Sequence, residues 1–224
     1  MIDRSPTRAL ACPIPQHSSR YPALLARISD PPPRLWLRGD PDALAAPCVA
    51  LVGSRAASPY GLQVAERLAA DLARAGVTVV SGLARGVDSA AHRGALITGR
   101  TVAVLGSGVD VIYPPEHDEL AARILGQGGA LLSELPPGAP PRRNHFPRRN
   151  RLISGLSLAV VVIEASSRSG SLQTARFGLE QGREVLAVPG TILGDRFGGS
   201  HALLRDGAKL VVSASDILEE LRPL

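Results

Sequence analysis

Basic side chains gather in one short segment of this sequence. The 224 residues include 24 arginines and one lysine, Lys209. No acidic residue lies between Glu134 and Glu164, whereas five arginines do: Arg142, Arg143, Arg148, Arg149 and Arg151. The rest of the chain holds 20 basic and 20 acidic residues, so this segment accounts for the whole formal charge of +5. Because the neutralisation of phosphates releases counterions, a local basic patch of this kind favours a polyanionic ligand.

The same segment places an aromatic ring and an amide, Phe146 and Asn150, among the arginines. Arginine binds phosphates, and Phe146 offers a face on which a base can stack, a contact worth about 1–3 kcal/mol per base. A solvated basic loop, or Phe146 packing in the core, is the alternative. Aromatic residues are only 3% of the chain, so we expect charge to supply most of the affinity. The segment is long and proline-rich, which predicts a loop that is mobile without a ligand.

Four further segments combine glycine and serine directly after apolar runs, at residues 53–55, 81–86, 106–108 and 166–171. Such loops lead into helix N-termini, where free backbone N–H groups attract an anion. Arg55, Arg85 and Arg168 add positive charge to three of them. An ordinary strand-to-helix turn is the alternative for each loop alone. Together with the arginine segment, they indicate one anion-binding face.

The motifs of common catalytic sites are absent from the sequence. There is no G-x-x-x-x-G-K-[ST] loop, no G-x-S-x-G elbow and no clustered carboxylate set, and residues 106–111 lack the last glycine of G-x-G-x-x-G. Asp88 and His92 share a helix face and form either an acid–base pair or a structural pair, of which we favour the second. Two cysteines exclude a multi-cysteine zinc site, and Cys48 opens an apolar run typical of a core. We therefore expect no catalytic residue, metal or cofactor.

Apolar runs and amphipathic stretches alternate along the chain, as in a doubly wound, mostly parallel α/β sheet with helices on both faces. In such sheets ligands bind beyond the carboxyl ends of the strands, where the glycine–serine loops lie. One helix start is explicit, with Ser58 as N-cap and Pro59 at the first helical position. The expected strands are 35–37, 48–53, 77–82, 101–106, 130–133, 158–164, 184–188 and 210–212. One expected helix follows Ser58 and stops at Gly76, and the others span 87–97, 116–125, 172–181 and 215–221.

The domain organisation that we expect has three parts. Residues 1–20 lack periodicity and are interpreted as a flexible N-terminal tail, residues 21–47 as a leader packed on the core, and residues 48–224 as the main domain. No apolar run approaches the roughly 18–20 residues of a membrane span, and no secretory pattern opens the chain, so we expect no membrane partner and a cytoplasmic location.

Several motifs, in order, resemble the DNA-processing protein A (DprA/Smf) family over about residues 20–215. The matching strings are Tyr21-Pro22, 52–55 (VGSR), Tyr60-Gly61, 81–88 (SGLARGVD), Ala91-His92, 106–108 (GSG), Tyr113-Pro114, 146–153 (FPRRNRLI), 169–171 (SGS) and 188–190 (VPG). Many members also carry a helical module before this region and a winged-helix module after it, for which this sequence shows no pattern.

The resemblance implies an extended Rossmann-like domain that binds single-stranded DNA. It implies a role in natural transformation, in which the protein protects incoming single strands and loads RecA recombinase onto them as a homodimer. It places Arg55 in the DNA pocket, Arg143 and Phe146 beside it, and Ser169 with Gly170 near the DNA backbone. The residues that we expect to bind DNA are Gly53, Ser54, Arg55, Gly82, Arg85, Arg142, Arg143, Phe146, Arg148, Arg149, Asn150, Arg151, Ser169, Gly170 and Ser171.

A second hypothesis comes from a different class of protein. A Rossmann-like nucleotide-processing enzyme, such as a phosphoribohydrolase of the lysine-decarboxylase-like group, shares the general architecture. The P-G-G-x-G-T loop of that group is absent here, which favours the DNA-binding hypothesis.

Overall fold

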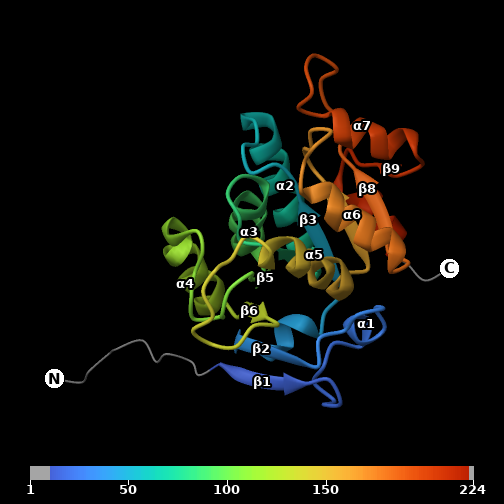
Figure 1. Ribbon diagram of the computed structural model, residues 1–224. Coiled ribbons are helices and arrows are strands. Elements are labelled where there is room, and N and C mark those ends of the chain that lie inside the picture. Colours follow the sequence, from blue (N-terminus) through green and yellow to red (C-terminus); the bar gives the residue numbers. More distant parts are fainter. Residues whose placement is uncertain (1–10, 222–224) are drawn as a thin grey trace.

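A single sheet organises residues 11–221, which are the residues that the computed structural model describes (Figure 1). Its strands run in the order β1-β2-β6-β5-β4-β3-β7-β8-β9. The strands from β3 to β9 are parallel, while β2 pairs antiparallel with β6 and β1 with β2. The bounds are β1 (Cys12–Pro15), β2 (Arg34–Gly39), β3 (Cys48–Val52), β4 (Thr78–Ser81), β5 (Thr101–Val104), β6 (Ala130–Ser133), β7 (Ala159–Val162), β8 (Glu184–Ala187) and β9 (Lys209–Leu210).

This arrangement confirms the predicted doubly wound, mostly parallel sheet, and it is Rossmann-like. Helices cover both of its faces (Figure 1). The helices are α1 (Ala23–Ala26), α2 (Pro59–Arg74), α3 (Val87–Thr98), α4 (Asp118–Gly126), α5 (His145–Leu156), α6 (Ser171–Glu180), α7 (Gly198–Arg205) and α8 (Ala214–Glu220).

The central strand β3 shows why the core has two halves. Successive side chains of a strand point to opposite faces of the sheet. Val49 and Leu51 pack into the apolar cluster formed with α2, α3 and α8. Ala50 and Val52 pack into the cluster formed with α1, α5 and α6. The strand is buried on both faces, which is why its sequence is a continuous apolar run rather than an alternating one.

The start of α2 follows the sequence signals. Ser58 is extended, and its Oγ accepts a hydrogen bond from the Gly61 N–H at 3.1 Å, while Pro59 occupies the first helical position. The helix then packs Ala65, Leu68 and Leu72 against the sheet. Its N-terminus is thereby fixed at the carboxyl end of β3.

The order of the strands creates a crevice beside β3. This strand lies between β4 and β7, so the connection after β3 and the connection after β7 lead to helices on opposite faces of the sheet. The two loops diverge at their common edge, which is the topological switch point where open α/β sheets bind ligands.

The arginine segment differs from its prediction. We expected a mobile loop, but residues His145–Leu156 form the helix α5. Pro147 lies in its first turn, where the missing backbone N–H breaks no helical bond. Leu152, Ile153 and Leu156 are buried against the sheet and hold the helix there. The segment is therefore a packed element of the core.

The N-terminal region also differs from its prediction in part. Residues 1–10 of the expected tail lie outside the described residues, but Cys12–Pro15 form the edge strand β1, paired with β2. The leader contains the expected strand, here Arg34–Gly39, and the short helix α1. The helix α7 was not predicted. None of the described helices combines the length and the apolar character that crossing a membrane requires.

Candidate nucleic-acid interface

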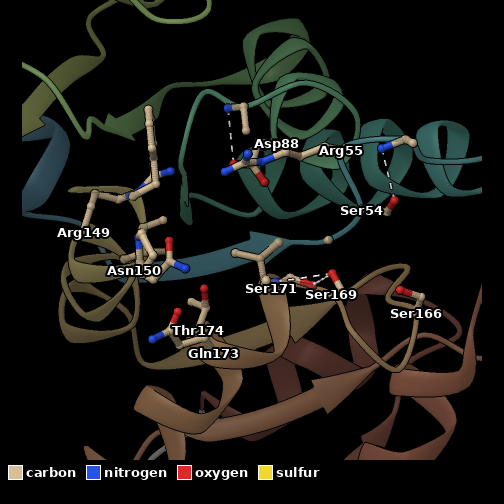
Figure 2. Close-up of a pocket in the computed structure, with 18 of the residues that line it drawn as sticks. Ser54, Arg55, Asp88, Arg149, Asn150, Ser166, Ser169, Ser171, Gln173 and Thr174 are labelled. Carbon is tan, nitrogen blue, oxygen red and sulfur yellow. Dashed lines mark hydrogen bonds between the residues drawn. The ribbon is translucent and has the colours of Figure 1, made fainter. Parts of the chain in front are cut away.

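A cavity of about 700 Å³ lies at the switch point, beyond the carboxyl ends of β3 and β7 (Figure 2). Ten of the predicted residues line it: Gly53, Ser54, Arg55, Arg143, Phe146, Arg149, Asn150, Ser169, Gly170 and Ser171. Residues outside the list of expected DNA-binding residues complete it, of which Ala84 and Ser166 belong to the predicted anion-binding loops: Val52, Ala56, Ala84, Asp88, Tyr113, Pro147, Ile153, Ser166, Gln173 and Thr174.

The loop between β3 and α2 supplies one wall of the cavity. The Ser54 N–H donates to the backbone oxygen of Glu164 at 2.7 Å, and the Ser54 Oγ accepts from the Ala56 N–H at 3.1 Å. These bonds fix the backbone from which the exposed side chain of Arg55 projects. Arg55 makes no ion pair with any residue of the described chain, so its charge is available to a ligand.

An aromatic surface lies next to this arginine. The guanidinium carbon of Arg55 is 5.7 Å from the ring centroid of Phe146, in a cation–π arrangement. The ring centroids of Tyr113 and Phe146 are 5.4 Å apart, and the two rings are tilted relative to each other. Phe146 is half-buried and Tyr113 is exposed. A Cβ atom at Gly106 would lie 2.8 Å from Cδ1 of Phe146, so glycine there makes room for the ring. A base can stack at this surface while Arg55 binds its phosphate.

The loop between β7 and α6 supplies the opposite wall. The helix begins at Ser171, and its N-cap residue Gly170 provides no side-chain cap. The hydroxyls of Ser169 and Ser171 lie 2.8 Å apart, and a Cβ atom at Gly170 would meet nothing within 4 Å. The Ser171 N–H donates to the Ser169 Oγ, and the Leu172 and Gln173 N–H groups donate to the backbone oxygens of Ser169 and Gly170. The start of α6 therefore favours a phosphate through the positive end of the helix dipole and the serine hydroxyls.

Buried opposite charges lie at the floor of the cavity. The guanidinium of Arg149 donates to the backbone oxygens of Gly82, at 2.7 Å, and of Val104. The Asp88 carboxylate accepts from the Gly82 and Ala84 N–H groups at 3.1 and 3.3 Å. Burial raises the pKa of Asp88, and the charge of Arg149 opposes this rise. Burial lowers the pKa of Arg149 to about 10, so it remains a cation at neutral pH.

A group of amides and a hydroxyl lies at one end of the cavity. In the view of Figure 2, Asn150 from α5 faces Gln173 and Thr174 from α6, away from Ser54 and Ser166. These side chains offer both donors and acceptors to the polar edge of a base. Gln173 and Thr174 follow Ser171 within one helical turn, which was the signal in the sequence that the prediction missed.

The remaining predicted residues do not line the cavity. Gly82 contributes its backbone to Arg149, and Arg142 is exposed outside the cavity. Arg85 pairs with Glu116 at 2.5 Å, and Arg148 pairs with Glu134 at 3.3 Å.

Arg151 has a structural role in place of the predicted DNA contact. It is buried, and it pairs with Glu134 at 2.6 Å and with Asp30 of the leader at 3.2 Å. Glu134, which precedes the acid-free segment in the sequence, thus forms ion pairs with two arginines of that segment, Arg148 and Arg151. The basic patch is accordingly smaller than the sequence predicts, with Arg143 at the cavity and Arg142 nearby in the chain.

The predicted pairing of Asp88 with His92 is wrong. Asp88 binds the backbone N–H groups at the cavity floor, whereas His92 Nδ1 lies 2.8 Å from the Thr101 hydroxyl. Burial lowers the pKa of His92 to about 3, which keeps the imidazole neutral. Within residues 11–221 no group of three or more histidine, cysteine, aspartate or glutamate side chains is placed to hold a metal ion.

Comparison with known proteins identifies the family of this chain. The model of the family DNA recombination-mediator protein A matches residues 13–222. Protein Smf of Escherichia coli is 50% identical over 93% of this chain, and the match spans 56% of that protein, or about half of its length.

Two solved structures share the fold. DNA processing protein A of Streptococcus pneumoniae superposes with a TM-score of 0.91 and 43% identity, over 97% of this chain and 76% of that one. A structure of DNA processing protein A from Helicobacter pylori, described for its single-stranded DNA binding mode, gives a TM-score of 0.82 and 30% identity, over 93% of this chain and 98% of that one. This chain therefore belongs to the DNA recombination-mediator protein A family.

Proposed function

We propose that this chain binds single-stranded DNA in the cavity between α5 and α6, with tolerance for sequence and without catalysis. The observation that carries the proposal is the position of Arg55, whose guanidinium lies over the ring of Phe146 in the same cavity that the start of α6 lines. One nucleotide at this point contacts a cation, a helix N-terminus and a stacking surface together. These are the components of sequence-tolerant binding to single strands.

The cavity favours a single strand over a duplex. In a duplex both faces of each base are already stacked on neighbouring bases, so Phe146 and Tyr113 have no free face to contact. The described residues also present no evident helix of a size and charge that would enter a major groove, since the arginines of α5 are largely turned into the protein. The Helicobacter pylori relative, whose printed description names single-stranded DNA binding, supports the same preference.

The biological role that we propose follows from the family. The protein protects incoming single strands during natural transformation and, as a homodimer, loads RecA recombinase onto the strand that it holds. The relatives named DNA processing protein support the first part, and the motif resemblance supports the second.

A titration tests the proposed function. Labelled oligothymidylate and a matched duplex are titrated with the protein at several salt concentrations, and the same preparation is assayed for turnover of mononucleotides. We expect preference for the single strand, a fall in log affinity of about 0.7 per phosphate neutralised for each tenfold rise in salt, and no turnover. Equal affinity for duplex or a flat response to salt contradicts the proposal. Turnover supports the phosphoribohydrolase hypothesis instead.

A further inference from the structure

A second cavity, of about 450 Å³, adjoins the first. The two share Ser54, Ala56 and Ser166, so a strand that leaves the first cavity past Ser54 enters the second. We propose that this second cavity holds the nucleotide next to the one at Arg55 and Phe146, with Leu193 as its apolar contact. The inference rests on the proposed function, because it extends the path of the same strand.

The outer wall of the second cavity is a loop between β8 and α7. The carboxylate of Asp195 accepts from the Ser167 N–H at 3.3 Å and from the Ser167 hydroxyl. The guanidinium of Arg196 donates to the Ala56 oxygen at 3.0 Å and to the Glu164 carboxylate at 3.3 Å. The loop is thus tied to both loops that form the first cavity. A loop fixed in this way binds with a smaller loss of conformational entropy than a free one.

This wall offers a nucleotide one apolar side chain, Leu193, and two charged side chains, Asp195 and Arg196. Leu193 lines the cavity and is 81% exposed, so its apolar surface is free to contact a base. The side chain of Arg196 makes two hydrogen bonds but is still half-exposed, so it can also donate to a phosphate. The neighbouring Asp195 carboxylate repels the same phosphate. The net charge of the two is zero, so we assign most of the binding contribution of this cavity to Leu193 against the base.

The loop itself provides a matched control. Ile192 precedes Leu193, is 85% exposed and does not line the second cavity. Ile192→Ala and Leu193→Ala therefore remove similar apolar area from the same loop, at the surface and without a hydrogen bond. A difference between the two variants reports on the cavity and not on the loop.

The test is a titration with oligothymidylates that lengthen one nucleotide at a time. For the wild type and Ile192→Ala we expect one added nucleotide to increase the affinity more than the others do, namely the nucleotide that first reaches the second cavity. We call this increase in affinity the step. In Leu193→Ala we expect that step to shrink by about fivefold, with shorter strands unaffected. An abasic site scanned along the longer strand locates the same step, because removal of the contacted base makes Leu193→Ala and the wild type bind alike.

Two results overturn the inference and are distinguishable from each other. If Leu193→Ala matches the wild type at every length, or if both variants weaken every length equally, the second cavity is not a nucleotide site although the first remains one. If the wild type binds no oligonucleotide at any length, the proposed function fails and this inference fails with it.

Discussion

The guanidinium of Arg149 donates a hydrogen bond to the backbone oxygen of Gly82, 2.7 Å away. A Cβ atom at position 82 would lie 2.1 Å from Nη1 of Arg149, so the glycine is required for this contact. Because Arg149 also bonds to Val104, it joins the carboxyl ends of β4 and β5 to α5. Two residues that the sequence assigns to DNA are thereby part of the support of the cavity.

We expect Arg149→Met to destabilise the fold strongly. The substitution leaves two buried carbonyl oxygens without donors and removes the cation near the buried Asp88, a loss of about 3–5 kcal/mol in the free energy of unfolding. Urea denaturation measures it. The neighbouring Arg148→Met is the control, because that side chain is exposed and its ion pair is worth less than about 1 kcal/mol. Equal losses in the two variants contradict the assigned role.

Arg55→Ala is expected to weaken DNA binding without unfolding the protein. The side chain is exposed, so the melting temperature should not change, whereas loss of a charged contact to phosphate lowers affinity about tenfold or more. The slope of log affinity against log salt falls by about 0.7. Arg143→Ala, at the rim, lowers the slope but costs less affinity. Arg67→Ala removes an exposed arginine of α2 that does not line the cavity and serves as the control. Wild-type binding by Arg55→Ala would place the DNA elsewhere.

Substitution of Phe146 separates stacking from charge. We expect Phe146→Ala to reduce the affinity for oligothymidylate by the value of one stacked base, about 1–3 kcal/mol, and to leave the salt slope unchanged because no charge is lost. Phe146→Leu retains apolar volume without an aromatic face and should recover little of the affinity. The measurement is the same salt series of titrations. A changed slope in Phe146→Ala, or full recovery in Phe146→Leu, argues against a stacking role.

The buried imidazole of His92 predicts that acid destabilises the fold. The Thr101 hydroxyl donates to the Val79 oxygen at 2.6 Å, so it accepts from His92 Nδ1–H, and Nε2 has no partner among the described residues. Burial lowers the pKa to about 3 from an unfolded value near 6.5. Stability from this group is present above about pH 6.5 and is lost as the pH falls toward 3, because only the unfolded state takes up the proton.

Urea denaturation at decreasing pH measures this effect. Between about pH 7 and pH 5 the wild type should lose about 2 kcal/mol through His92. The variant His92→Asn keeps a side-chain N–H for Thr101 but cannot titrate, so the difference between the two curves isolates the imidazole. Parallel curves for the two proteins would show that His92 does not carry the acid sensitivity.

The sequence predicts those parts of the fold whose signals are local. The run 48–53 is apolar throughout because β3 is buried on both faces, and Ser58 with Pro59 marks the start of α2 directly. The strand β1 escapes prediction because Pro13 and Pro15 are tolerated only at a sheet edge, and the edge is defined by its partner β2.

The candidate site likewise contains residues that local sequence signals predict and residues whose role depends on distant partners. Loops at strand ends, such as those of Ser54 and Ser169, are predictable because a parallel sheet brings its carboxyl ends together. The role of Arg151 is not, since its partners Glu134 and Asp30 lie outside the segment. A count of charges along the chain treats each arginine as free, whereas the fold neutralises some of them and buries others.

The two walls of the first cavity come from distant parts of the chain. Ser58, at the start of α2, and Glu164, just beyond β7, are hydrogen-bonded neighbours separated by 106 residues. Such a contact has a high contact order, and the entropy of closing the intervening loop must be overcome before the contact stabilises anything. The capacity to bind an oligonucleotide therefore requires that both distant segments are already in place. A nascent chain on the ribosome acquires it only after β7 has emerged and docked on β3.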